Sequence, residues 1–226
     1  MYTYLLINLF SVFFPVLFSF HPKIKFYKKF SILFPAILIT AVLFIIWDIA
    51  FTQQGVWGFN PNYVTGIYFF NLPLEEVLFF ICIPFSSIFI YESLIAFEVK
   101  DYFKNSEKKI TAFLIILCCV MLTAFYDKLY TSFTFGLNLL FLVVYIFFIK
   151  YKFLSRFYFA YLLVLIPFFI VNGILTGTGV DEPIVWYNNT ENLGIRILTI
   201  PAEDAFYGML MLMLSITFYE RQLKRF

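Results

Sequence analysis

Charged residues are scarce in this chain. Asp, Glu, Lys and Arg make up 13% of its 226 residues, whereas a soluble domain carries about 25%. The mean hydropathy is +0.89, which also excludes an ordinary soluble domain. The net charge of only +2 gives no reason to expect a nucleic-acid partner. We therefore expect a membrane protein.

Residues that hold metals and cofactors are also few. His21 is the only histidine, and it lies among lysines. Cys82, Cys118 and Cys119 fall within apolar segments and lack the spacing of a zinc site or a redox pair. The chain has no Gly-x-Gly-x-x-Gly motif for a dinucleotide. We expect neither a metal nor a cofactor.

Long apolar segments, by contrast, fill most of the sequence. A run of about 20 apolar residues is long enough to cross a bilayer as a helix. The sequence therefore predicts an all-α, multi-pass membrane bundle of seven transmembrane helices. The expected helices cover residues 2–20, 30–51, 73–95, 110–127, 131–149, 157–175 and 201–220.

The positions of the basic residues support this number of helices. When the loops are assigned to alternate sides of the membrane, all but two of the 16 Lys and Arg fall on one side. The other side receives only Lys128 and Arg196. Basic loops are typically cytoplasmic. We expect the cell membrane, with the N-terminus outside and the C-terminus in the cytoplasm.

An acidic motif occurs twice. Pro73-Leu74-Glu75-Glu76 returns 128 positions later as Pro201-Ala202-Glu203-Asp204. The same spacing relates three further dipeptides or residue pairs: Gly66-Ile67 to Gly194-Ile195, Ser87-Ile88 to Ser215-Ile216, and Tyr91-Glu92 to Tyr219-Glu220. It places the first three helices on the last three and leaves the fourth as a connector.

The repeat predicts three regions. A first repeat covers residues 1–98, a linker with the connecting helix covers 99–128, and a second repeat covers 129–226. Three helices plus one connector make an even number of crossings, so the two repeats run parallel. Both acidic motifs then lie at the same depth, on the lysine-poor side.

A helix start is the simplest explanation of the motif. Proline favours the first helical position, carboxylates complement the helix dipole, and Asn71 and Thr199 are candidate N-caps. Two carboxylates per motif exceed that need, and a charge at the centre of a membrane helix costs about 2.5–3.5 kcal/mol. Neighbouring side chains point about 100° apart on a helix. One carboxylate of each pair is therefore expected to face the interior.

Other polar and aromatic residues are expected near the motifs. Asp48 and Asn172 end the helices that precede the two loops, and Tyr68, Phe79 and Tyr207 lie close to the motifs in sequence. We predict that these five bind the substrate. The loops 52–72 and 176–200 either fold over the bundle as a lid or form simple turns at the membrane surface. Glu92 and Glu220 are expected to be solvated helix ends at the opposite side.

Paired carboxylates in an apolar, aromatic bundle suit acid chemistry on a hydrocarbon. A buried carboxyl group acts as a general acid and its neighbour as a general base. Protonation of an alkene gives a carbocation, which a desolvated aromatic ring stabilises by about 2 kcal/mol.

The duplicated motif, opening the last helix of each three-helix repeat, resembles the lycopene cyclase domain of the small membrane-embedded carotenoid cyclases. The resemblance implies cyclisation of lycopene or a related acyclic carotenoid to a β-type ring, an isomerisation without redox change or cofactor. It implies that Glu75, Glu76, Glu203 and Asp204 are catalytic. We expect Glu75 and Glu203 to be the principal acids and Glu76 and Asp204 to be bases or orienting partners. The expected partners are the polyene, membrane lipid and other carotenoid enzymes.

Two alternatives remain open. Parallel repeats with carboxylates also build proton-coupled carriers, and another proton-initiated enzyme, such as a hydratase of carotenoid end groups, would use the same acids. A retinal photoreceptor is excluded because residues 201–220 contain no lysine. A diphosphate-binding prenyltransferase is excluded because the chain has no Asp-x-x-x-Asp motif.

Overall fold

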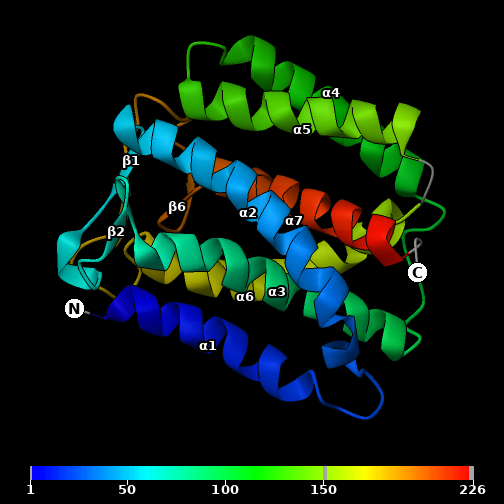
Figure 1. Ribbon diagram of the computed structural model, residues 1–226. Coiled ribbons are helices and arrows are strands. Elements are labelled where there is room, and N and C mark those ends of the chain that lie inside the picture. Colours follow the sequence, from blue (N-terminus) through cyan, green and yellow to red (C-terminus); the bar gives the residue numbers. More distant parts are fainter. Residues whose placement is uncertain (1, 150–151, 224–226) are drawn as a thin grey trace.

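The computed structural model describes residues 2–149 and 152–223 and contains, within them, seven α-helices that lie side by side as a bundle (Figure 1). The N- and C-termini lie at opposite ends of the bundle. The helices are α1 (Thr3–Phe18), α2 (Phe30–Gln53), α3 (Leu74–Ala96), α4 (Glu107–Ala124), α5 (Leu129–Phe148), α6 (Leu154–Leu175) and α7 (Ala202–Leu223), with short 3₁₀ turns at Phe26–Lys29 and Pro61–Tyr63.

Each observed helix begins and ends within three residues of the predicted segment. Four are long and apolar enough to cross a membrane: Phe26–Gln53, Leu74–Ala96, Leu129–Phe148 and Leu154–Leu175. Among the other three, α1 is apolar but only 16 residues long. Helices α4 and α7 carry acidic residues in their first turn.

The two three-helix repeats interlock. Within each repeat the first helix packs on the third, so α1 lies on α3 and α5 lies on α7. The middle helix packs across, with α2 on α7 and α6 on α3. Helix α4 lies against α5 at the outside of the bundle (Figure 1). Helices α3 and α7 are therefore at the centre, and their first turns carry the acidic motifs.

The prediction of an all-α fold is wrong in one respect, because the loops before α3 and α7 contain short strands. Each loop ends in a two-stranded hairpin, β2–β3 in the first repeat and β5–β6 in the second. A third pair, β1–β4, joins the two loops to each other. The strands are β1 (Trp57–Phe59), β2 (Tyr68–Phe69), β3 (Leu72–Pro73), β4 (Val185–Tyr187), β5 (Arg196–Ile197) and β6 (Ile200–Pro201).

The strand pairing follows the same 128-residue repeat. In the β1–β4 pair, Gly58 lies opposite Trp186, and these positions are themselves 128 residues apart. The register is thus symmetric about that pair, as expected when a two-fold axis relates the repeats. Gly66 and Gly194, also 128 apart, both have positive φ, of 83° and 69°. Glycine adopts this conformation without steric cost.

Glu92 and Glu220 are not simple solvated helix ends, contrary to the prediction. The Tyr91 hydroxyl donates to Glu220 Oε1 at 2.7 Å, and the Tyr219 hydroxyl donates to Glu92 Oε1 at 2.6 Å. Glu92 is buried and also forms an ion pair with Lys29. These two reciprocal bonds join α3 to α7 at the end of the bundle away from the acidic motifs.

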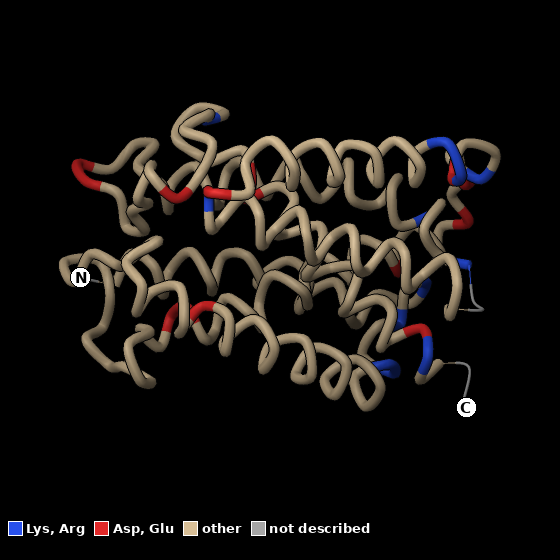
Figure 2. Tube along the Cα trace, turned by 90° about the horizontal axis from the view of Figure 1, so that it is seen from above, with Lys and Arg blue, Asp and Glu red and all other residues tan. Residues whose placement is uncertain are grey.

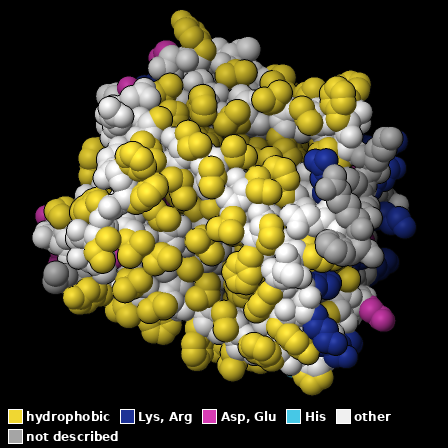
Figure 3. All heavy atoms as spheres, viewed as in Figure 1, with side chains coloured by type: hydrophobic (Ala, Val, Ile, Leu, Met, Phe, Trp, Pro, Cys, Tyr) yellow, Lys and Arg dark blue, Asp and Glu magenta, His cyan; other side chains and the backbone are white. Residues whose placement is uncertain are grey.

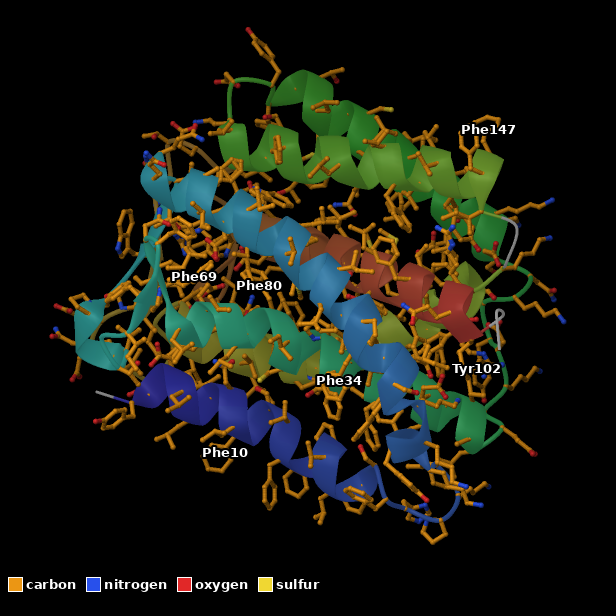
Figure 4. All side chains as sticks on the ribbon, in the orientation of Figure 1. Phe10, Phe34, Phe69, Phe80, Tyr102 and Phe147 are labelled. Atoms are coloured by element: carbon orange, nitrogen blue, oxygen red, sulfur yellow. The ribbon has the colours of Figure 1, made fainter. Side chains whose placement is uncertain are left out.

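The charge distribution agrees with the sequence pattern. Most Lys and Arg side chains gather at the end of the bundle that holds the C-terminus (Figure 2). Hydrophobic side chains cover the flank of the helices (Figure 3). Phe10 and Phe147 project outward from this flank and are 73% and 75% exposed (Figure 4). Lys150, Lys224 and Arg225, which belong to the expected cytoplasmic group, lie outside the described residues.

Candidate active site

A cavity of about 750 Å³ lies at the acidic end of the bundle, between the two repeats. Helices α3, α6 and α7 form most of its wall, and strands β1 and β4 cover it. The lining residues are Tyr4, Asp48, Trp57, Phe59, Glu76, Phe79, Ile83, Tyr130, Tyr161, Val164, Phe168, Asn172, Leu175, Thr176, Val185, Tyr187, Asp204, Tyr207, Gly208, Met211 and Leu212. The two long loops therefore fold over the bundle as a lid.

Two carboxyl groups of the first repeat lie together in this cavity. Glu76, in the first turn of α3, accepts a hydrogen bond from the Tyr4 hydroxyl at 2.5 Å. Asp48, in the last turns of α2, lies within hydrogen-bonding reach of Glu76. Asp48 Oδ1 accepts bonds from the Trp57 indole N–H and from Thr52 Oγ1. Both carboxyl groups are buried.

Asp48 Oδ2 is buried and receives no hydrogen bond from an N–H or O–H donor among the described residues. Two carboxyl groups form a hydrogen bond to each other only when one of them carries a proton. In a medium of low dielectric constant, two adjacent carboxylates repel each other and share a proton. The pair of Asp48 and Glu76 is therefore arranged to hold a proton between its two oxygens.

A third carboxyl group, from the second repeat, faces this pair. Asp204 is the counterpart of Glu76, and its charge interacts with that of Glu76. Its Oδ1 accepts from the Tyr130 hydroxyl at 2.7 Å, and its Oδ2 accepts from the Tyr187 hydroxyl at 3.0 Å. Burial, together with the neighbouring Asp204 charge, raises the pKa of Tyr187 well above its ordinary value. This phenol therefore stays a proton donor at physiological pH.

The remaining members of the two motifs do not line the cavity. Glu75 Oε1 accepts the Thr65 backbone N–H at 2.7 Å, and Glu203 Oε1 accepts the Leu193 N–H at the same distance. Both side chains are fully buried. Glu203 Oε1 also accepts from Thr131 Oγ1 at 2.6 Å. In each repeat, the first carboxylate thus holds the preceding loop to the helix, while the second faces the cavity.

The N-cap explanation of the motif is wrong. Pro73 is the N-cap residue of α3, and no side chain caps that end. Asn71 instead donates its side-chain amide to the Ile49 carbonyl of α2 at 2.9 Å. Thr199 bonds to Thr176 and to the Gly173 carbonyl, both on or beside α6. These two residues tie the hairpins to the neighbouring helices.

Most of the predicted substrate-binding residues come together. Asp48, Phe79, Asn172 and Tyr207 all line the cavity. Tyr68 does not, because it lies on β2 with 47% of its surface exposed. Asn172 was expected as the counterpart of Asp48. At the 128-residue spacing that counterpart is Thr176, which also lines the cavity.

Four functional candidates escaped the sequence reasoning. Tyr4 and Tyr130 bind the two cavity carboxylates, and Trp57 and Tyr187 reach them from the lid. A signal was present for the first two, since each stands in the first turn of the helix that opens its repeat. They are 126 residues apart, so the 128-residue register paired Tyr130 with Tyr2 instead.

Aromatic rings form the floor and sides around the acids. The ring of Tyr207 lies 4.7 Å from Trp47 and 6.2 Å from Trp57, centroid to centroid. It is also 6.3 Å from Tyr130. Phe79 occupies the position equivalent to Tyr207 in the first repeat and also lines the cavity. Such faces attract a positive charge.

No cluster of three or more His, Cys, Asp and Glu side chains that could hold a metal occurs in residues 2–149 and 152–223. The three cysteines are free thiols, and none of them lines the cavity. The described site therefore consists of carboxyl groups, phenols, one amide and an aromatic, apolar wall.

The comparisons with known proteins agree with this arrangement. No curated protein and no solved structure is detectably similar to the chain. A family model described as lycopene cyclase matches residues 1–94 and 127–221. The matched segments contain both acidic motifs and all helices except α4. The chain belongs to the lycopene cyclase family, a family of carotenoid cyclases.

Proposed function

We propose that this protein closes the end groups of lycopene or a related acyclic carotenoid into β-type rings by proton-initiated isomerisation. One observation carries the proposal above the others. The Asp48–Glu76 carboxyl pair faces Asp204 across an aromatic cavity, with every acid supported by a phenol or indole donor. The cavity provides a proton donor, a proton acceptor and a wall that tolerates a cation.

The proton held between Asp48 and Glu76 is transferred to the terminal double bond of the polyene. The resulting cation is attacked by a double bond further along the chain, and the new carbon–carbon bond closes the ring. Asp204 then accepts a proton from a ring carbon beside the new cationic centre. One proton enters and one leaves, so the product is an isomer of the substrate.

Glu76 and Asp204, rather than Glu75 and Glu203, are the principal acid and base in this proposal. Glu75 and Glu203 serve by holding the lid, because each accepts the backbone N–H of a loop residue. The order expected within each motif is thereby reversed. Tyr4, Tyr130 and Tyr187 are positioning residues, since they fix the orientation of the carboxyl groups.

The surrounding rings and the lid supply the rest of the environment. Trp57, Phe79 and Tyr207 offer faces to the cation, each contributing about 2 kcal/mol when water is excluded. Exclusion of water also protects the cation from capture as an alcohol. The β1–β4 pair covers the cavity and supports this exclusion.

All seven helices cross the cell membrane in this proposal, with the N-terminus outside and the C-terminus in the cytoplasm. The apolar flank and the four long apolar helices support membrane insertion. The concentration of Lys and Arg at the end that holds the C-terminus supports the orientation. The acidic cavity then lies toward the outer leaflet.

Expression in cells that accumulate lycopene, followed by chromatography and mass spectrometry of the pigments, tests the proposal. We expect a cyclic product with the same mass as the substrate. A product heavier by one water would identify a hydratase instead. Pigment that stays acyclic in cells containing the folded protein would contradict the proposal and favour a carrier.

A further inference from the structure

A second cavity continues the first along the membrane-embedded part of the bundle. It holds about 440 Å³ between α1, α3 and α6. Five residues line both spaces: Phe79, Ile83, Val164, Phe168 and Asn172. The acid cavity therefore opens directly into this second space, which we call the α1–α3–α6 groove.

The groove has the length and the polarity of a hydrocarbon site. On α3, the continuous wall runs from Glu76 to Ile90, which at 1.5 Å per residue is about 21 Å. Its serines are not free to bind a polar ligand on their own. The Ser86 hydroxyl bonds to the backbone carbonyls of Ser11 and Cys82, at 2.8 and 2.9 Å. The rest of the lining is largely apolar.

The two-fold axis generates a related groove between α2, α5 and α7, with about 1360 Å³ of space. Three pairs of residues 128 positions apart line the two grooves: Leu43 and Val171, Phe44 and Asn172, and Leu214 and Ser86. None of the described residues that line this second groove also lines the acid cavity. The repeats therefore differ in whether their groove reaches the acids.

The difference has a cause in the residues of α2. Phe44 and Trp47 pack on the Tyr207 ring, with centroids 5.0 and 4.7 Å away. These rings form a wall between the α2–α5–α7 groove and the cavity. The equivalent positions on α6 hold Asn172 and Leu175, which line the cavity without closing it.

We infer that the long arm of the acyclic substrate lies in the α1–α3–α6 groove while its end group lies in the acid cavity, and that the polyene enters from the bilayer by this groove alone. This inference rests on the proposed function. One entrance and one set of acids mean that the two ends of a polyene react in separate binding events.

Matched substitutions distinguish the two grooves. Val171→Trp fills the α1–α3–α6 groove at a residue that does not line the acid cavity, and Leu43→Trp makes the same change at the related position of the other groove. Two substrates are supplied to the purified proteins in lipid vesicles: the full-length acyclic polyene, and a short isoprenoid with the same end group that reaches only the acid cavity.

We expect Val171→Trp to lower kcat/KM for the long polyene by about tenfold or more, chiefly through KM, and to leave the short substrate unaffected. Leu43→Trp should change neither. Equal loss with both substrates in Val171→Trp, or loss of the long polyene in Leu43→Trp alone, would overturn the inference. A wild-type protein that cyclises neither substrate contradicts the proposed function itself.

A milder pair guards against misfolding of the tryptophan variants. Ser86→Leu places in the α1–α3–α6 groove the residue that the related position, Leu214, already carries. The same selective loss with the long polyene is expected. A Ser86→Leu protein that is well folded and unchanged with both substrates counts against the inference.

Discussion

The two carboxylates of each acidic motif differ in what they contact. Glu75 and Glu203 each accept a backbone N–H from the loop ten residues before them. Glu76 and Asp204 line the cavity and accept hydrogen bonds from tyrosine hydroxyls. Neighbouring positions on a helix point about 100° apart, so a motif of two acids serves both the lid and the cavity.

Substitution of the cavity pair should therefore abolish most of the chemistry. Glu76→Gln and Asp204→Asn each remove a group that gives or takes a proton, and we expect kcat to fall by about 10²–10⁴-fold. The matched variants Glu75→Gln and Glu203→Gln keep an oxygen that accepts the loop N–H. They should retain most of the activity.

Turnover of acyclic polyene by the purified variants in lipid vesicles measures this difference. Equal amounts of monodisperse protein serve as the control for folding. Normal activity in Glu76→Gln together with an inactive Glu75→Gln would restore the order that the sequence suggested.

Sequence reasoning reached part of the site at this scale. The acids, Asn172 and Tyr207 could be predicted because polar residues are rare in apolar helices and the motif is duplicated. Tyr4 and Tyr130 could not, since a tyrosine among 16 tyrosines carries little information. Which acid faces the cavity depends on the rotation of α3 and α7, and hydrophobic patterning leaves that rotation undefined when every face is apolar.

Helices α3 and α7 are the elements that carry the site, and they are joined at their far ends. The two bonds from Tyr91 to Glu220 and from Tyr219 to Glu92 are equivalent by the repeat. Each spans from one helix to the other. They hold the two central helices in one rotation, and so fix how Glu76 and Asp204 face each other.

Removal of these hydroxyls should destabilise the bundle without altering the chemistry directly. A hydrogen bond to a charged group contributes about 1.5–3 kcal/mol, so Tyr91→Phe and Tyr219→Phe should each lower the thermal unfolding midpoint in detergent. Tyr102→Phe is the control, because Tyr102 is 61% exposed. Midpoints that match the control in both variants would show that the reciprocal bonds contribute nothing.

The helices were predictable as elements, and the strands were not. Runs of apolar residues define each helix to within three residues. The β1–β4 pair joins segments 128 residues apart and only three residues long, so no local alternation of polar and apolar residues reveals it. The lid was therefore expected only as one of two possibilities.

At the scale of the whole molecule, the repeats form one cavity and not two. Asp48 and Glu76 come from the first repeat, and Asn172 and Asp204 come from the second. Both middle helices cross to the other repeat, α2 to α7 and α6 to α3. Neither repeat contains the complete set of acids.

Separation of the repeats tests this arrangement. We expect segments 1–98 and 99–226 to be inactive when each is produced alone, because each lacks the opposing carboxylate. Produced together in lycopene-accumulating cells, they should restore cyclic pigment. Ring formation by either segment alone would mean that each repeat holds a site of its own.

The most direct measurement of the central claim is the mass of the product formed in deuterated water. If a buried carboxyl group starts the reaction, its exchangeable proton becomes part of the ring. Purified protein in vesicles made with D₂O should then yield a cyclic product that carries one deuterium for each ring closed, and Glu76→Gln should form almost none. A cyclic product without deuterium, or full labelling by Glu76→Gln, would contradict the account.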